Sequence, residues 1–382
     1  MSATPTDQLE YTATELLASH RYAEPLVANG IACHGGFDDD GTYVSPRTLH
    51  RVPAIAAWER RRVADSGTPI LHLPLETWPE HFPNVAQAKF LIGKGVSAPT
   101  VSELTRIGTV EGFGAMMRYL PLPDFQTAIA DSIQGTAVEH IRKGLFEAHS
   151  RDEAGWEDEA GHDRMWFAAR DIAFEHPVSA DQTATLLARM GIPAPGGPMP
   201  DFEKIRAAAI ASRALPHDIP FELESVLVRM IGLLFIELSA FRAFTWAEDV
   251  LADPNLVAGD GEAARIVSYI RQDETPHVGY LQVALSELRD RTWQGEGGRT
   301  YPGDQMIQLL WDKALDESLF ARRGDFLRLI VREITGAVEG RTDAVDLLDE
   351  FFVLGSVERL DDGTLIERTP GGTEVRVAPL AA

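Results

Sequence analysis

The chain has 382 residues, of which 45% are hydrophobic and 24% are charged, which is enough for a large buried core. Its net charge of −23 argues against a nucleic-acid partner, because the phosphates would be repelled. The single cysteine, Cys33, excludes an internal disulfide and a thiolate cluster, so a bound metal would be held by carboxylates and imidazoles. No apolar run is long enough to span a bilayer and no secretory signal is recognisable, so we expect no membrane partner and a cytoplasmic location.

The first 120 residues mix short helices with turn-rich segments, and no pattern in them indicates a chemistry. Short helices are predicted over 47–67 and 84–93, and the proline-containing segment 68–79 is predicted to be extended. We interpret residues 1–120 as an N-terminal extension that packs on the helical part of the chain.

From Pro123 onward the apolar residues recur at helical spacing. An amphipathic helix is predicted to end near His149. The polar stretch 150–159 then turns the chain into a second helix, which the proline at 177 ends. A Pro/Gly-rich crossover at 191–201 divides the helical region in two.

The second half of the helical region begins with a short helix at 202–213. A long helix at 223–251 and a partner helix at 262–290 follow, joined by a loop rich in Asp, Pro and Gly. Further helices are predicted over 303–320, 324–338 and 342–354. The last residues alternate in polarity between DDG and PGG turns, which indicates a small β-meander. We therefore expect a mainly α protein with a bundle at 121–295 and a C-terminal part of helices and β-meander at 296–382.

The pentapeptide Asp-Glu-x-x-His occurs twice, as DEAGH at 158–162 and as DETPH at 273–277. On a helix, residues i and i+3 lie on one face, so a Glu and a His with this spacing can reach one point beside the helix. Helical bundles hold two metal ions in this way, with Glu-x-x-His from two helices and one Glu from each of two others. The repeated pentapeptide therefore predicts a dimetal site that needs two further glutamates.

Each pentapeptide follows a predicted helix that offers a single Glu. Glu237 interrupts the apolar run 230–241, where an unpaired buried carboxylate would cost on the order of several kcal/mol. Its distance along the chain from Glu274 fits a helical hairpin that returns to the same level. For the first pentapeptide we select Glu139, because the rival Glu147 leaves barely enough chain for a turn before the pentapeptide.

With these motifs the chain resembles the ferritin-like di-iron carboxylate superfamily, and among its members the soluble di-iron oxygenases that include the arylamine N-oxygenases. The resemblance covers about 123–290 and implies a ferritin-like four-helix bundle core. It implies as metal ligands Glu139, Glu159, His162, Glu237, Glu274 and His277. It also implies that Asp158 and Asp273 accept hydrogen bonds from the outer N–H groups of the ligand imidazoles.

Several features allow other interpretations. The acidic stretch around Glu159 is also typical of a solvated first helical turn, and His162 could be an ordinary core histidine. Pro276 either kinks the second helix or marks a helix start that Asp273 caps. Three other histidines nearby are expected to lie off the site. His140 follows Glu139 directly and so points to another face of the helix, and His149 and His176 lie near helix ends.

Other kinds of site find less support in the sequence. There is no Gly-rich phosphate loop and no GxSxG nucleophile motif. The segment CHGG, which contains Cys33 and His34, stands out but predicts no nucleophile.

The resemblance implies an O2-dependent oxidase or oxygenase that hydroxylates, N-oxygenates or desaturates a small organic substrate. Its cofactor would be two Fe ions, with an Fe/Mn pair as the variant, and O2 would be the co-substrate. The electron donor is not indicated, and a homodimer is left open. The alternatives are a non-catalytic ferritin-like metal-handling or metal-stabilised interaction protein, and a metal-free helical protein in which the pentapeptides recur by chance.

Overall fold

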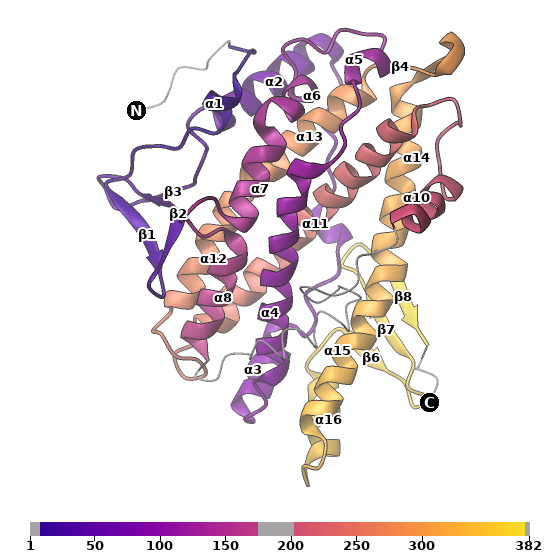
Figure 1. The fold of residues 1–382 in the computed structure, drawn as a ribbon. Coiled ribbons are helices and arrows are strands. Elements are labelled where there is room, and N and C mark those ends of the chain that lie inside the picture. The colour runs from indigo at the N-terminus through magenta and orange to yellow at the C-terminus, as the bar shows by residue number, and fades with distance from the viewer. Residues whose placement is uncertain (1–7, 175–201, 379–382) are drawn as a thin grey trace.

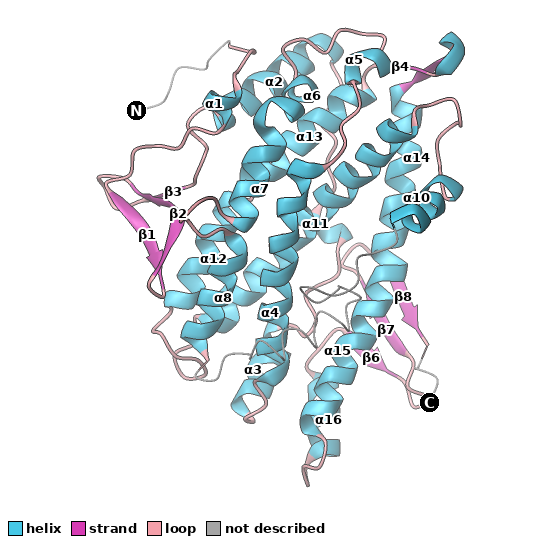
Figure 2. Ribbon diagram, viewed as in Figure 1, coloured by secondary structure: helices cyan, strands magenta, loops and turns pink. Residues whose placement is uncertain are grey.

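The structure, a computed structural model, describes residues 8–174 and 202–378. It is mainly helical, with small antiparallel sheets at the periphery (Figure 2). The α-helices are α1 (Ala13–Leu16), α2 (Arg51–Ser66), α3 (Val85–Gly93), α4 (Ala98–Gly112), α5 (Phe125–Ala128), α6 (Ala137–His140), α7 (Phe146–Ala154), α8 (His162–Ala173), α10 (Phe202–Ala211), α11 (Phe221–Leu251), α12 (Glu262–Asp273), α13 (Thr275–Arg289), α14 (Gly303–Asp316), α15 (Arg323–Val338) and α16 (Ala344–Val353). The sheets are formed by β1 (Glu24–Ala28), β2 (Ile31–Phe37) and β3 (Tyr43–Val44), by β4 (Thr292–Gln294) and β5 (Thr300–Pro302), and by β6 (Val357–Arg359), β7 (Leu365–Arg368) and β8 (Glu374–Val377).

The centre of the molecule is a bundle in which α4, α7, α8, α11, α12 and α13 pack on one another (Figure 1). The predicted hairpin of two long helices is present: α11 runs one way, and α12 and α13 together run back beside it. In the ranges that the structure describes, no helix combines the length and the apolar character needed to cross a membrane.

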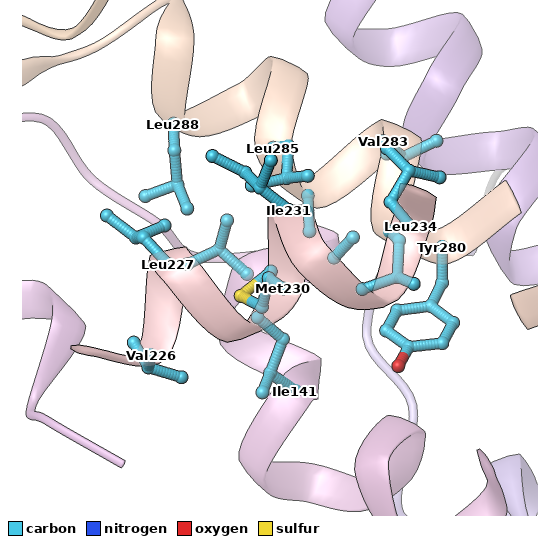
Figure 3. Close-up of a cluster of buried hydrophobic side chains, with 14 of the residues drawn as sticks. Ile141, Val226, Leu227, Met230, Ile231, Leu234, Tyr280, Val283, Leu285 and Leu288 are labelled. Atoms are coloured by element: carbon cyan, nitrogen blue, oxygen red, sulfur yellow. The ribbon is translucent and has the colours of Figure 1, made fainter. Parts of the chain in front are cut away.

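Apolar packing fixes α11 against α13 (Figure 3). Leu227, Ile231 and Leu234 of α11 are fully buried, and they lie in the same cluster as Leu285 and Leu288 of α13. Burial of each such side chain contributes roughly 1.5–3 kcal/mol. This core sets the level at which the polar residues further along both helices meet.

The first bundle helix differs from the prediction of one helix that ends near His149. The chain forms the short helix α6, then a π-helical turn at Ile141–Leu145 in which Gly144 has φ 145°, and then α7, which continues to Ala154. Such a φ favours glycine, and the turn rotates the helix face that follows it. The turn into the next helix therefore lies at 155–161, later than predicted.

The N-terminal region supplies more than an extension. Helix α4 packs on α7 and α8 and so belongs to the bundle, although it lies within the first 120 residues. Strand β2 reaches the start of α8, where the Ala160 amide donates to the Ala32 carbonyl over 2.9 Å and the His34 amide donates to the Ala160 carbonyl over 3.1 Å. This pairing places His34 beside the bundle.

The C-terminal prediction is confirmed: helices α14, α15 and α16 precede an antiparallel meander of β6, β7 and β8. Arg323 of α15 donates from Nε to Oε2 of the buried Glu367 over 2.7 Å and so ties the meander to the helices. The predicted helix end at 175–177, His176 and the crossover at 191–201 lie outside the described residues.

A buried carboxylate joins α13 to the start of α6. Glu287 accepts from the backbone amides of Ala137 over 3.2 Å and Val138 over 3.1 Å, and burial raises its pKa to about 7. A pKa raised by folding gives stability that is full at acidic pH and is lost as the pH rises through about 7.

We therefore expect Glu287→Gln to become relatively more stable with rising pH. Between pH 5 and pH 8, the free energy of unfolding of the wild type should fall relative to the variant by about 1–3 kcal/mol. Urea unfolding of both proteins at the two pH values measures this difference. A difference that does not change with pH would show that folding does not raise the pKa of Glu287.

Candidate metal centre

Carboxylates and imidazoles from five parts of the bundle meet in one place, which we name the central cluster. Its members come from the end of α4, from α7, from the start of α8, from the middle of α11 and from the junction of α12 and α13: Glu111, His149, Glu153, His162, Glu237, Glu274 and His277. All are buried except Glu111, which is half-buried. These groups could hold metal ions, since carboxylate oxygen and imidazole nitrogen are common metal ligands.

The central cluster divides into two sets of potential ligand atoms, and within each set the atoms lie within 4.8 Å of one another. The first position is formed by His149, Glu153, Glu237 and His277, and the second position by Glu111, Glu153, His162 and Glu274. Glu153 belongs to both. A carboxylate that belongs to both sets can bridge two cations.

Short distances define the first position. His149 Nε2 lies 3.3 Å from Glu237 Oε1 and 3.5 Å from Glu153 Oε1. His277 Nδ1 lies 3.2 Å from Glu153 Oε1 and 2.6 Å from Glu274 Oε2. The two imidazole rings stack with their centroids 3.9 Å apart.

The second position is organised around His162. Its Nδ1 lies 2.9 Å from Glu274 Oε1 and 3.5 Å from Glu153 Oε1. Glu274 therefore faces His277 with one oxygen and His162 with the other, and it lies between the two positions. The Trp166 indole donates to Glu111 Oε1 over 3.2 Å and orients the carboxylate at the end of α4.

Each imidazole of the cluster has a polar partner at its outer nitrogen. His277 Nε2 lies 2.9 Å from Asp152 Oδ2, and His162 Nε2 lies 3.4 Å from Asp273 Oδ2. His149 Nδ1 lies 3.2 Å from the Tyr280 hydroxyl. When the outer nitrogen carries the proton, the inner nitrogen presents a lone pair to the cluster, as a metal ligand must.

Several buried atoms of the cluster have no hydrogen-bond partner: His149 Nε2, both carboxylate oxygens of Glu153, His162 Nδ1 and Nε2, and Glu274 Oε1. A buried polar atom without a partner costs about 1–3 kcal/mol, so such atoms are uncommon in folded proteins. All of these atoms except His162 Nε2, which faces Asp273, converge on the two positions. The donor set therefore fits a pair of cations.

The charge balance also fits two divalent cations. Within the described residues, the four glutamates of the cluster and the two aspartates behind it, Asp152 and Asp273, face two guanidinium groups. Arg47 Nε lies 2.6 Å from Asp152 Oδ1, and Arg51 Nη2 lies 2.6 Å from Asp152 Oδ2. With all carboxylates ionised and the imidazoles neutral, as metal ligands are, these groups carry four uncompensated negative charges, which two divalent cations would match. Without a cation, Glu274 and Glu153 raise the pKa of His162 well above its usual range, so its imidazole supplies part of the missing positive charge.

The ionisation of the buried groups reflects the same imbalance. Burial and the negative charge of Glu274 hold the pKa of Glu153 well above its usual range, and burial and Glu237 do the same for the pKa of Glu274. Burial, and then the neighbouring His149 imidazole, lower the pKa of His277 to about 3, which keeps the His277 imidazole neutral at pH 7. The raised carboxyl pKa values express a repulsion that a cation between the carboxylates would relieve.

Four of the six predicted ligands lie in the central cluster: His162, Glu237, Glu274 and His277. Asp273 lies behind His162, at the position predicted for a hydrogen-bond acceptor. Pro276 is the second residue of α13, and Glu274, which separates α12 from α13, keeps helical angles (φ −71°, ψ −20°), so the face is preserved. Asp273 caps no helix.

Glu139 is not in the cluster. It lies in α6, half-buried, where it pairs with Lys143 Nζ over 2.7 Å and accepts from the Gly135 amide over 2.7 Å. Glu139 and Glu153 lie on opposite sides of the π-helical turn at Ile141–Leu145, Glu139 in α6 and Glu153 near the end of α7. The rival Glu147 also lies apart, since its carboxylate pairs with Arg151.

Asp158 and Glu159 are exposed and lie in the turn before α8, where Trp156 and Glu159 exchange backbone hydrogen bonds of 3.0 Å. Helix α8 begins only at His162, so neither carboxylate shares a helix face with that imidazole. The interpretation of this acidic stretch as solvated is the one that the structure supports.

Glu111 and Glu153 are ligand-like residues that the sequence did not predict. The prediction that His149 lies off the site is wrong, because α7 continues past it and turns it toward Glu237. His149 and Glu153 are four residues apart on α7 and so share a face, a signal that was present in the sequence. The tetrapeptide DEAG occurs at 152–155 and again at 158–161, and the first copy supplies the buried Asp-Glu pair. For Glu111, in TVEGFG, the sequence offers no comparable signal.

Comparisons with protein-family models, with curated proteins and with solved structures found no match for this chain. The geometry of the central cluster is therefore the main indication of what the protein does.

Gly114 leaves room for the shared carboxylate. A Cβ at this position would overlap Cγ of Glu153 and approach its Cβ to 2.6 Å, whereas a Cβ at Gly232 of α11 would meet nothing within 4 Å. We expect Gly114→Ala to displace Glu153 and to weaken cation binding at least about tenfold. Isothermal titration with Mn²⁺ measures the affinity.

Gly232→Ala is the control and should bind Mn²⁺ like the wild type, with a gain in stability of about 0.5–1 kcal/mol from its helical backbone. Equal Mn²⁺ affinity of Gly114→Ala and the wild type would contradict the assignment of Glu153 to the centre.

Proposed function

We propose that this protein is a non-haem di-iron enzyme with a ferritin-like bundle, which uses O2 to oxidise a small organic substrate. The observation that supports this proposal most is the pair of four-residue sets that share Glu153 inside a buried core. Two irons bound there would supply reductive activation of O2.

The chemistry of the donor set favours iron, with manganese as the variant. Calcium and magnesium prefer oxygen ligands alone, and a structural zinc site takes four ligands in a closed tetrahedron. The central cluster instead mixes four carboxylates with three imidazoles. Such a set of ligands suits divalent iron and manganese. Each position also contains more than one carboxylate, which would neutralise the charge of a bound cation.

The residues of the chain would contribute binding, orientation and exclusion of water. The four glutamates neutralise the cations, and Asp152 and Asp273 hold the imidazoles of His277 and His162 by their outer nitrogens. Most of the cluster is inaccessible to solvent, which limits side reactions. Glu111 is the half-buried member, so we infer that O2 and substrate approach from its side.

Metal analysis tests the dimetal part of the proposal. Protein produced with iron should contain two Fe per chain, and Glu237→Gln should lose iron because the first position loses a charged ligand. Glu224→Gln is the matched control: Glu224 is also buried on α11, but it pairs with Arg213 Nε over 2.7 Å, away from the cluster. Iron contents of Glu237→Gln and Glu224→Gln that equal each other would contradict the assignment, as would a wild type without transition metal.

Oxygen uptake tests the catalytic part. Protein loaded with Fe²⁺ should consume O2 over many turnovers when a chemical reductant and an oxidisable organic compound are supplied, with product formed in proportion. An oxygen electrode and product analysis measure both quantities. A non-catalytic metal-handling protein would instead oxidise and load iron beyond two per chain, and that result would overturn the oxygenase proposal while leaving the metal centre in place.

A further inference from the structure

Arg47, in the loop between β3 and α2, has an unusual backbone for a large residue. Its φ is 52°, in the left-handed region, and its side chain is buried. This conformation costs a residue with a Cβ roughly 1–2 kcal/mol, so contacts with neighbouring residues must stabilise the backbone here. One of them is the Ser19 hydroxyl, which accepts from the Arg47 amide over 2.9 Å.

The guanidinium of Arg47 lies directly behind the first position. Its Nε donates to Asp152 Oδ1 over 2.6 Å, and the other oxygen of Asp152 lies 2.9 Å from His277 Nε2. Arg51 Nη2 approaches that second oxygen to 2.6 Å. The orientation of the His277 ring therefore depends on a carboxylate that two arginines of the N-terminal segment fix.

The same guanidinium reaches toward the second position. Arg47 Nη2 lies 3.2 Å from His34 Nδ1, and His34 Nε2 lies 3.6 Å from Asp273 Oδ2. That oxygen also accepts from the Tyr43 hydroxyl over 2.9 Å and faces His162 Nε2 at 3.4 Å. A series of polar contacts thus runs from His277 through Arg47 to His162, in which Asp273 lies near the His34 and His162 rings without forming a hydrogen bond to either.

We propose that Arg47 is a positioning residue that fixes the imidazoles of both cation positions at once, and that residues 34–51 thereby form the outer wall of the metal centre. The proposal rests on the dimetal centre proposed above. Arg47 is the branch point, because its two ends serve different positions. Of the two acceptors, Tyr43 contacts Asp273, which lies behind His162, and Arg51 contacts Asp152, which lies behind His277.

A simpler role for Arg47 would be to neutralise the buried Asp152. Arg51 already supplies a positive charge to that carboxylate, so neutralisation alone does not require a second guanidinium. It also does not explain a strained backbone, which aims the side chain at both Asp152 and His34. A positioning role accounts for both features.

Two variants of Arg47 separate these roles. Arg47→Gly relieves the left-handed backbone and removes the guanidinium, so a loss of metal in this variant cannot be attributed to backbone strain. Arg47→Lys keeps the positive charge but loses the planar fork that reaches two acceptors. Under neutralisation alone Arg47→Lys binds cations like the wild type, whereas under positioning it does not.

The experiment is a Co²⁺ titration of the metal-free full-length protein, followed by the visible absorption of bound Co²⁺ and by metal analysis after gel filtration. We expect the wild type to bind two Co²⁺. Arg47→Gly and Arg47→Lys should bind both ions about 10–100-fold more weakly and with altered spectra. Tyr43→Phe should weaken one of the two ions and leave the other unchanged, and thermal unfolding of the metal-free proteins shows that each variant is folded.

The chain offers matched controls. Arg62→Lys alters another buried arginine, which pairs with Asp290 over 2.8 Å away from the cluster, and Tyr301→Phe removes another Tyr–Asp hydrogen bond, of 2.6 Å to Asp218. Both should bind two Co²⁺ with wild-type affinity and spectrum.

The outcomes separate the two proposals. A wild type that binds fewer than two Co²⁺ overturns the dimetal centre and this inference with it. A wild type that binds two, with Arg47→Lys indistinguishable from it in affinity and spectrum, overturns the positioning role of Arg47 alone, whatever the result for Arg47→Gly.

Discussion

The uncompensated negative charge inside the bundle is the constraint on which the rest of the structure depends. Four glutamates and two aspartates are buried or half-buried around one point, and Arg47 and Arg51 are the guanidiniums that face them. A single buried carboxylate without a counter-charge costs several kcal/mol, and a folded protein is stable by only about 5–15 kcal/mol. The fold can therefore keep these groups only if protons or cations occupy the space between them.

Protons and cations compete for the same space. The pKa values of Glu153 and Glu274 are raised by burial and by neighbouring carboxylates, so without metal these groups retain protons. A cation that enters must displace them, which links its affinity to pH and adds its binding free energy to the stability of the fold. Elements from α4 to α13 converge on the cluster, so such a cation would stabilise the whole bundle rather than one hairpin.

The sequence predicts the half of the centre that lies on regular helices and leaves the other half open. The hairpin of α11 with α12 and α13 follows ordinary helical periodicity, so Glu237, Glu274 and His277 could be placed together from spacing alone. The opposite half contains the π-helical turn, followed by α7 and α8 with a tight turn between them. The π-helical turn changes both the helix face and the height along the bundle at which every later residue lies. Local spacing consequently favoured the second DEAG, which precedes His162 directly, over the first, which is buried.

Contacts that cross the whole chain are invisible to local patterns, and they explain why the N-terminal region gave no chemical signal. A minimal bundle can supply ligands from its helices, but each ligand imidazole also needs an acceptor at its outer nitrogen, and each buried acceptor needs a donor or counter-charge. Here Asp152 and Asp273 are the acceptors, and their partners His34, Tyr43 and Arg47 come from strands and loops far away in sequence. The strained backbone of Arg47 and the position of His34 place polar partners behind both aspartates, so residues 34–51 belong physically to the cluster that the later helices build.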